Sequence, residues 1–331
     1  MKAAIRPLLS ATLLLSSLWS CTEHEIEREF VPEPSRLVIY GVLHPGDTLL
    51  SVWISRTRPV NDTRSPLPVL NATARLSQNG QSPTTLSLRN PDEGHYSVAV
   101  APQPGSWYEL EVAAPGFSPV RTQTQVPEPI RHSVVHQVAA INEPPEGCSG
   151  CSPYVVRYQL EATLADPPGQ ENYYEVASAM QYFRQDTGYT APTFEVLDTI
   201  TNEGTYRLDV ATDDPLFFRG YETDEVIRDQ QLTFSDRLFD GQTQTFRYQT
   251  RHEARQKFRS TMRESYHLLS LLRTLHPDLH HYQRGISSHT GLNNLPFAEP
   301  TSVSGNVEGG YGIFSSYSED TVFIGVEPPG D

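Results

Sequence analysis

Short runs in which apolar and polar residues alternate set the pattern of the first third of the chain. In the run 48–60, Leu50, Val52 and Ile54 fall on one face of an extended strand, with polar residues between them. Runs of the same kind occupy residues 36–43, 72–81, 94–100, 107–116 and 117–127. About seven short strands in roughly ninety residues predict a β-sandwich of immunoglobulin-like size.

Longer strands follow a predicted boundary in the segment 127–135. Residues 154–166, 172–184 and 320–328 are each predicted as a strand, and 230–250 as two strands joined through a turn. The turn residues are Asp240-Gly241, and Asn79-Gly80 predicts a hairpin in the first half. The pattern therefore predicts a mainly β protein: an N-terminal immunoglobulin-like sandwich and a second β-rich domain.

One run follows a helical period instead. In SYHLLSLLRTL (265–275), Tyr266, Leu269 and Leu272 lie along one stripe, which predicts a helix near 265–284. Pro277 either ends or kinks this helix, or opens a further turn at the first helical position with His276 or its neighbour as the cap.

The N-terminus predicts export. Lys2 and Arg6 precede an apolar run of about a dozen residues, which is too short to span a bilayer and suits the core of a signal peptide. The run stops just before Cys21, in an arrangement that resembles a bacterial lipobox, so we expect lipid on Cys21. An ordinary cleaved signal followed by an unmodified cysteine is the alternative.

The sequence predicts four segments along the chain. They are a lipoprotein signal peptide (1–20), an acidic and proline-containing tether (21–35), the sandwich (36–127) and the second β-rich domain (128–331). The formal net charge is −15, so neither nucleic acid nor anionic lipid headgroups are expected partners.

Two cysteines, Cys148 and Cys151, form a C-x-x-C in a segment rich in glycine and proline. In an oxidising compartment we expect a local disulfide between them. A zinc site needs two more ligands, and a redox pair of the thioredoxin type should open a helix, whereas a strand follows here. Both remain alternatives.

Histidines gather in the segment 276–289. His276 and His280 have the i, i+4 spacing of a helical zinc pair, although Pro277 interrupts the helix and no glutamate lies between them. A solvated, histidine-rich helix end is the simpler interpretation. Ser235, Asp236 and His267 could suggest a triad, but nothing resembles a nucleophile elbow, and Asp236-Arg237 is expected to form a local ion pair.

The segment 212–225 is long, aperiodic and aromatic, which is typical of a binding loop. Phe217, Phe218, Arg219 and Tyr221 within it are the expected contact surface.

The glycine-rich stretch 306–318 comes within one residue of a dinucleotide-binding fingerprint. It is followed by a predicted strand and not by a helix, so the glycines are expected to permit a positive φ or a close backbone approach. Tyr311 and Phe314 are expected to fill the core. No cofactor is expected.

Several stretches occur in the same order in a family of Bacteroidota lipoproteins known as a domain of unknown function, and the chain resembles this family from about residue 20 to its end. The stretches are the opening strands 36–60, LTFSDRLFDGQT (232–243), the tyrosine- and leucine-rich run 265–275 and NNLPFAEPTSVSGNVEGGYGIFSSYS (293–318). The resemblance implies an immunoglobulin-like sandwich, a second β-rich domain and an outer-membrane lipoprotein, often encoded beside a TonB-dependent receptor. It supplies no catalytic residues.

We therefore expect a surface-exposed outer-membrane lipoprotein that binds rather than catalyses, as an accessory to a TonB-dependent β-barrel receptor in nutrient capture or uptake. A lipid anchor and a short tether would hold its binding surface near the channel. A structural or adhesion lipoprotein is the alternative, and an exported enzyme is the third candidate.

Overall fold

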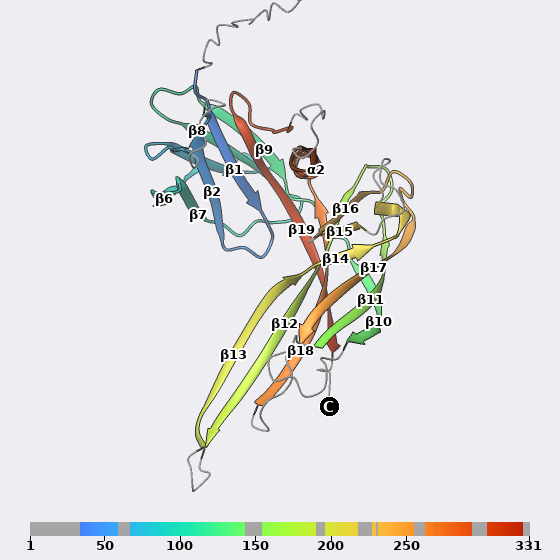
Figure 1. The fold of residues 1–331 in the computed structure, drawn as a ribbon. Coiled ribbons are helices and arrows are strands. Elements are labelled where there is room, and N and C mark those ends of the chain that lie inside the picture. Colours follow the sequence, from blue (N-terminus) through green and yellow to red (C-terminus); the bar gives the residue numbers. More distant parts are fainter. Residues whose placement is uncertain are drawn as a thin grey trace, which may run out of the picture. The chain divides into compact units, whose positions relative to one another are not determined.

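The computed structural model describes residues 34–58, 67–142, 154–189, 196–217, 227–229, 231–254, 262–292 and 303–326. Residues Ser35 to Asp331 form one compact unit. Strands make up most of its described part, together with one α-helix, α2 (Pro277–Leu292) (Figure 1). The predicted fold class, mainly β with one substantial helix, is confirmed.

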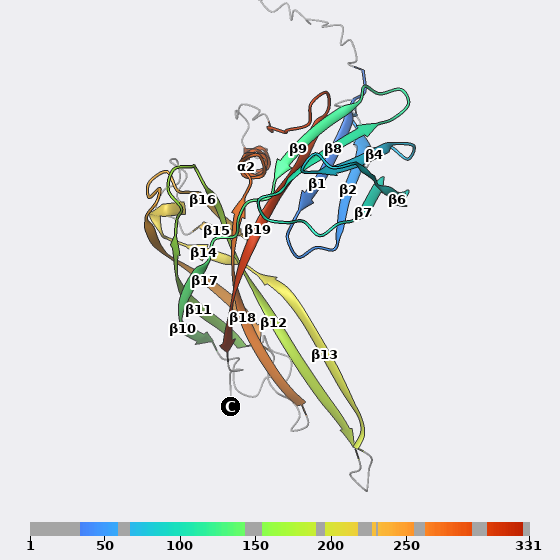
Figure 2. The same cartoon turned by 180° about the vertical axis from the view of Figure 1, so that it is seen from behind.

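The first part of the chain forms a two-layer sandwich. Its strands are β1 (Leu37–Leu43), β2 (Leu49–Arg56), β3 (Leu67–Pro68), β4 (Thr73–Gln78), β5 (Thr84–Thr85), β6 (Ser87–Asn90), β7 (His95–Ala99), β8 (Trp107–Ala113) and β9 (Val120–Gln125). One layer holds β1, β2, β7 and β6, and the other is a four-stranded sheet in the order β5-β4-β8-β9 (Figure 2). Alternating residues such as Ile39, Val52 and Leu110 are fully buried between the layers.

The predicted hairpin at Asn79-Gly80 is confirmed. Both residues have a positive φ, 49° and 72°, and the amide of Gln81 donates to the carbonyl of Gln78 at 2.9 Å. The turn joins β4 to β5, which pair antiparallel.

The remaining strands build a second core. They are β10 (His132–Asn142), β11 (Tyr154–Ala165), β12 (Tyr173–Tyr189), β13 (Val196–Leu208), β14 (Val210–Thr212), β15 (Ile227–Asp229), β16 (Gln231–Ser235), β17 (Thr243–Ala254), β18 (Met262–Leu275) and β19 (Tyr311–Val326), with a 3₁₀ turn η2 (Pro215–Phe217). A five-stranded sheet, in the order β10-β11-β17-β14-β15, contributes Leu160 and Tyr248 to this core. The sheet that contains β12, β18 and β19 contributes Tyr174 and Leu268.

Strand β19 belongs to both cores. Its first part pairs parallel to β1, from Val38 opposite Tyr311 to Leu43 opposite Ser316, and its second part pairs antiparallel to β18, from Leu275 opposite Tyr317 to Tyr266 opposite Val326. A ten-stranded sheet results. Eight of its strands follow the order β13-β12-β18-β19-β1-β2-β7-β6, and the other two, β16 and β3, pair with β12 and β2. Phe314 accordingly packs in the first core and Ile324 in the second.

The helix predicted from 265–275 is wrong, because this segment is strand β18. It lies between β12 and β19, and every residue from Leu268 to Leu275 is buried. A central strand covered on both faces is apolar throughout and loses the alternation that would reveal it. The helix begins at Pro277 instead, and the amide of Asp278 donates to His276 Nδ1 at 3.3 Å. The alternative of a proline-opened turn capped by His276 is therefore confirmed.

The glycines of the stretch 306–318 serve the backbone. Gly309 and Gly312 have φ of 79° and 100°, and a Cβ on Gly312 would lie 1.9 Å from the carbonyl oxygen of Ile39. Strand β19 follows directly. Phe314 fills the core as predicted, but Tyr311 is 47% exposed, because it stands on the outer face of the sheet beside Arg36.

Candidate functional site

A groove of about 480 Å³ lies where α2 meets the ten-stranded sheet, which we call the long sheet. It is lined by residues of β1, β12, β13, β18, β19 and α2, namely Tyr40, Val42, Glu175, Arg207, Arg273, Leu275, Leu279, Tyr282, Gln283, Ile286, Ser287 and Tyr317. The lining combines three tyrosines with charged and amide groups, which is the composition of a polar-ligand site.

The helix α2 is held against the sheet by its first turn. Leu279 is 4% exposed and packs with Tyr173 and Leu275, with Tyr317 against them. Because Pro277 and the His276 cap fix where the helix starts, the next turn brings Tyr282 and Gln283 into the lining of the groove.

The floor of the groove is ionic. Glu175, Arg273 and Glu319 lie opposite one another on β12, β18 and β19. Arg273 Nη1 donates to Glu175 Oε1 at 2.6 Å, and its Nε donates to Glu319 Oε2 at 2.7 Å. The guanidinium also lies 4.8 Å from the centroid of the Tyr317 ring. Arg273 is thus held on two edges and one face.

These charges are buried, and burial is costly. The side chain of Glu175 is 0% exposed and that of Arg273 is 10% exposed. Burial by itself lowers the pKa of Arg273, but Glu175 and then Tyr317 and Glu319 raise this pKa by more. A buried ion pair is poor evidence for stability, so its position at the floor of a groove favours a role in recognition.

Gln283 links the helix to this floor. Its Nε2 donates to Glu175 Oε2 at 3.3 Å. Its Oε1 is buried and has no hydrogen-bond donor in the part of the chain that the structure describes.

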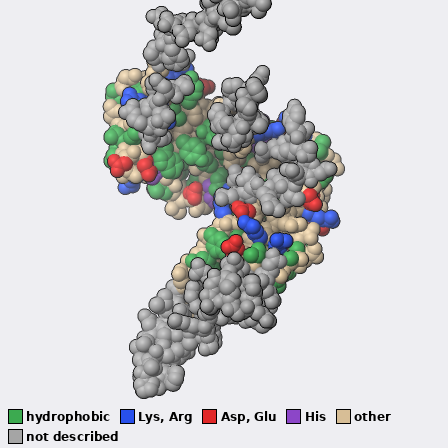
Figure 3. Space-filling model, in the orientation of Figure 1, with side chains coloured by type: hydrophobic (Ala, Val, Ile, Leu, Met, Phe, Trp, Pro, Cys, Tyr) green, Lys and Arg blue, Asp and Glu red, His purple; other side chains and the backbone are tan. Residues whose placement is uncertain are grey.

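Exposed or half-buried aromatic rings continue from the groove across the outer face of the sandwich. Tyr40 lies opposite Trp53 with ring centroids 5.9 Å apart, and Trp53 stacks on His95 at 5.0 Å. Figure 3 shows hydrophobic side chains gathered over β1 and β2, with acidic and basic side chains at their border. We call Tyr40, Trp53 and His95 the aromatic row.

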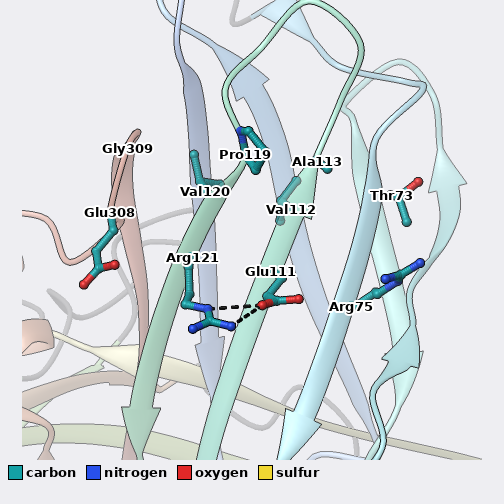
Figure 4. A pocket seen from close by; sticks show the side chains of 10 residues that line it. All are labelled: Thr73, Arg75, Glu111, Val112, Ala113, Pro119, Val120, Arg121, Glu308 and Gly309. Carbon is teal, nitrogen blue, oxygen red and sulfur yellow. Dashed lines mark hydrogen bonds and ion pairs between the residues drawn. The ribbon is translucent and has the colours of Figure 1, made fainter.

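A second groove, of about 630 Å³, lies on the β4-β8-β9 sheet (Figure 4). Arg121 on β9 points toward β8, where it pairs with Glu109 and Glu111. These side chains are largely exposed, and none of their charges is buried. The groove therefore resembles an ordinary charged surface more than the α2 groove does.

Six of the residues singled out from the sequence lie outside the described ranges. They are Cys21, Cys148, Cys151, Phe218, Arg219 and Tyr221. Phe217 is described and is 3% exposed, with edge contacts to Phe234 and Phe246 at 5.2 and 5.6 Å. Phe217 therefore belongs to the second core and not to a contact surface, because η2 turns it inward.

His276 and His280 do not converge on a common point. His276 caps α2, whereas His280 is 5% exposed and stacks on Tyr173 with centroids 4.5 Å apart. Burial lowers the pKa of His276.

The described residues bring together one potential metal-ligand set, Asp166, Asp236 and Asp240. Their oxygens already accept hydrogen bonds from the Tyr174 hydroxyl, Asn172 and the amides of Gly241 and Gly169. The cluster thereby fixes the turns between neighbouring strands.

The expected Asp236-Arg237 ion pair is wrong. Asp236 accepts from Asn172, and Arg237 pairs with Glu171, because the turn points the two side chains apart. Among the described residues, neither Ser235 nor His267 forms a side-chain hydrogen bond with Asp236, whose carboxylate accepts from Asn172.

A different Asp-His-Ser chain exists, which the sequence did not reveal. Asp320 Oδ2 lies 2.8 Å from His132 Nδ1, and His132 Nε2 lies 2.9 Å from the Ser270 hydroxyl. Ser270 is 1% exposed and its hydroxyl lies 2.6 Å from that of Tyr248. Burial is the main cause that lowers the pKa of His132. The chain crosslinks four strands within the core, where a substrate does not reach the serine.

Within the described residues no helix has both the length and the apolar character needed to cross a bilayer.

The family described as Domain of unknown function (DUF4249) matches residues 23–322 of the chain. The search of curated proteins found no match to the chain. Among solved structures, the chain is similar to a DUF4785 family protein from Legionella pneumophila, with 11% sequence identity and a TM-score of 0.22. The match covers 74% of this chain and 54% of the other, so the chain spans about half the length of that protein.

Proposed function

The chain belongs to the DUF4249 family, and from the groove at α2 we propose that it is a binding protein, anchored by lipid to the outer membrane as an accessory of a TonB-dependent receptor. The observation that carries the binding role is the ionic floor of the groove. A guanidinium held by two carboxylates and a tyrosine ring is fixed before any ligand arrives. Preorganised polar groups beside apolar walls are what a specific ligand site needs.

The anchoring part of the proposal rests on the sequence. Cys21 ends the apolar run of the predicted signal peptide, and residues 21–35 would tether the folded unit to the membrane. A short tether keeps a binding surface at high effective concentration near a membrane receptor. The acidic surface, with a net charge of −15, argues against nucleic acid as the partner.

The test is an affinity pull-down of the tagged full-length chain from outer membranes solubilised in detergent. The expected result is co-purification of a TonB-dependent β-barrel receptor in stoichiometric amount. A Cys21→Ala variant, processed without lipid, is the matched control and should recover less receptor. If no barrel protein is enriched over the untagged strain, the accessory role is wrong and the adhesion alternative is favoured.

A further inference from the structure

We propose that the α2 groove binds a neutral oligosaccharide, an inference that rests on the binding role proposed above and specifies its ligand class. The groove is lined by the charged groups of Glu175, Arg207 and Arg273, by the amide of Gln283 and by the rings of Tyr40, Tyr282 and Tyr317, and Glu319 holds Arg273 from β19. Three properties of this set point to a sugar.

The first property is charge balance. The two arginines of the lining, Arg207 and Arg273, are matched in number by two carboxylates: Glu175, which also lines the groove, and Glu319, which binds Arg273 from β19. A site for an anion or a cation would leave one sign in excess. A balanced set instead offers donors and acceptors side by side, which suits a neutral ligand whose neighbouring hydroxyls each donate and accept.

The second property is an incomplete hydrogen-bond network. Gln283 donates to Glu175 through Nε2, but its buried Oε1 has no donor among the described residues. A buried acceptor left in this state costs about 1–3 kcal/mol. A hydroxyl in the groove would satisfy it once the Gln283 side chain turns toward the groove, because Oε1 is closed to solvent in this conformation. Arg273 likewise uses only two of its five N–H donors in the hydrogen bonds to Glu175 and Glu319.

The third property is the aromatic wall. A sugar ring has an apolar C–H face and a polar edge, and tyrosine offers a flat apolar surface with a hydroxyl at its end. Tyr40, Tyr282 and Tyr317 line the groove together with Val42 and Leu275. Apolar faces of the ligand can therefore lie on the rings while its edge reaches the ionic floor.

The size and the exit of the groove favour more than one sugar unit. Its volume of about 480 Å³ lies within the usual range of small-ligand sites. Tyr40 belongs both to the groove and to the aromatic row, so a chain leaving the groove would meet Trp53 next. Both rings are partly exposed, at 46% and 37%.

The test is binding of the purified full-length chain to an array of neutral and acidic oligosaccharides, in a detergent without a sugar headgroup. Calorimetry then measures the affinity of the best neutral ligand. We expect at least one neutral oligosaccharide to bind. Tyr282→Ala and Gln283→Leu should each weaken it by about tenfold or more, because each removes one contact of the kind described.

Arg121→Ala, in the groove of Figure 4, is the matched control and should bind as the unmodified chain does. Circular dichroism checks that all variants are folded. The proposal is overturned if no neutral oligosaccharide binds, if only acidic ones bind, or if Tyr282→Ala and Gln283→Leu bind normally. If one of these results is obtained and the pull-down still recovers a receptor, the oligosaccharide proposal is wrong, whereas the accessory role is retained.

Discussion

Glu175 and Arg273 face each other across β12 and β18, and the 2.6 Å hydrogen bond between them lies beneath the α2 groove. Each is a charged residue within the mostly apolar, buried part of its strand. The ion pair is part of both the long sheet and the floor of the candidate site. Substitutions at these two positions can therefore be tested for their effect on protein stability and on ligand binding.

Arg273→Met should destabilise the protein by about 3–5 kcal/mol, because it leaves the fully buried Glu175 without its cation. The double variant Glu175→Gln/Arg273→Met should lose less than this single variant, since no buried charge remains at that position. Urea unfolding followed by tryptophan fluorescence measures both. Arg121→Met, at an exposed pair, is the control and should show no measurable loss. Equal losses in the single and double variants would contradict the argument.

Gly312→Ala should cost far more than a positive φ alone explains. The conformational cost is about 1–2 kcal/mol, and the contact of a Cβ with the Ile39 carbonyl should add about 1–3 kcal/mol or more. Gly169→Ala is a matched control, because Gly169 has a φ of 92° and nothing within 4 Å of an added Cβ. Urea unfolding of the two variants separates the conformational cost of the positive φ, which both share, from the steric cost of the contact with Ile39, which only Gly312→Ala has. Similar losses at both positions would show that the close approach to β1 is unimportant.

Acid should destabilise the fold through His252. Burial lowers the pKa of His252 to about 4, from an ordinary value near 6.5, and its Nδ1 lies 2.6 Å from the Tyr206 hydroxyl. Above pH 6.5 the imidazole is neutral in both states and this contribution to stability is complete. Between pH 6.5 and 4 only the unfolded chain binds the proton, so about 3 kcal/mol is lost as pH falls.

The measurement is the free energy of unfolding between pH 7.5 and 4, for the unmodified chain and for His252→Gln. The variant should show a shallower decline over this range. Other buried histidines such as His132 titrate in both proteins and cancel in the comparison. His136→Gln, on the exposed part of β10, is the control. The hypothesis fails if His252→Gln and His136→Gln change the slope equally.

Cys21→Ala should release the protein from the membrane fraction, because the lipid on Cys21 is the expected anchor. Fractionation followed by immunoblotting measures the bound share, and Cys148→Ala is the control for loss of a cysteine elsewhere. Membrane association at the unmodified level would rule out the lipid anchor.

Thiol titration of the unreduced, denatured chain should find neither Cys148 nor Cys151 reactive, because the expected local disulfide occupies both. The same titration after reduction should recover the two thiols. Two reactive thiols before reduction would exclude the disulfide.

Alternation predicted the sandwich well, because strands with one buried face show it directly. The run that contains Leu50, Val52 and Ile54 became β2 with those three residues buried. Alternation failed at 265–275, where burial on both faces of β18 removed the polar positions that would have marked the strand. The chance stripe of Tyr266, Leu269 and Leu272 then suggested a helix.

The candidate groove was not predicted from the sequence, because its residues come from six separate elements. A usable signal was nevertheless present. Glu175 and Arg273 each interrupt an apolar run, NYYEVASAM and LLSLLRTL, and a charge inside a buried strand needs a partner. Only the pairing of β12 with β18 shows that each is the other's partner.

The return of β19 to the side of β1 has a kinetic consequence. Val38 and Tyr311 are neighbours in the sheet although nearly the whole folded chain separates them in sequence. Bringing the two strands together costs conformational entropy before any stabilising contact between them forms. The pairing of β19 with β1 should therefore be a slow step in folding. Until it occurs, β1 keeps an unpaired edge and the first core lacks Phe314. During synthesis, the sandwich nearest the N-terminus would therefore be completed only when the last strand emerges, and a shortened chain would expose that edge to aggregation.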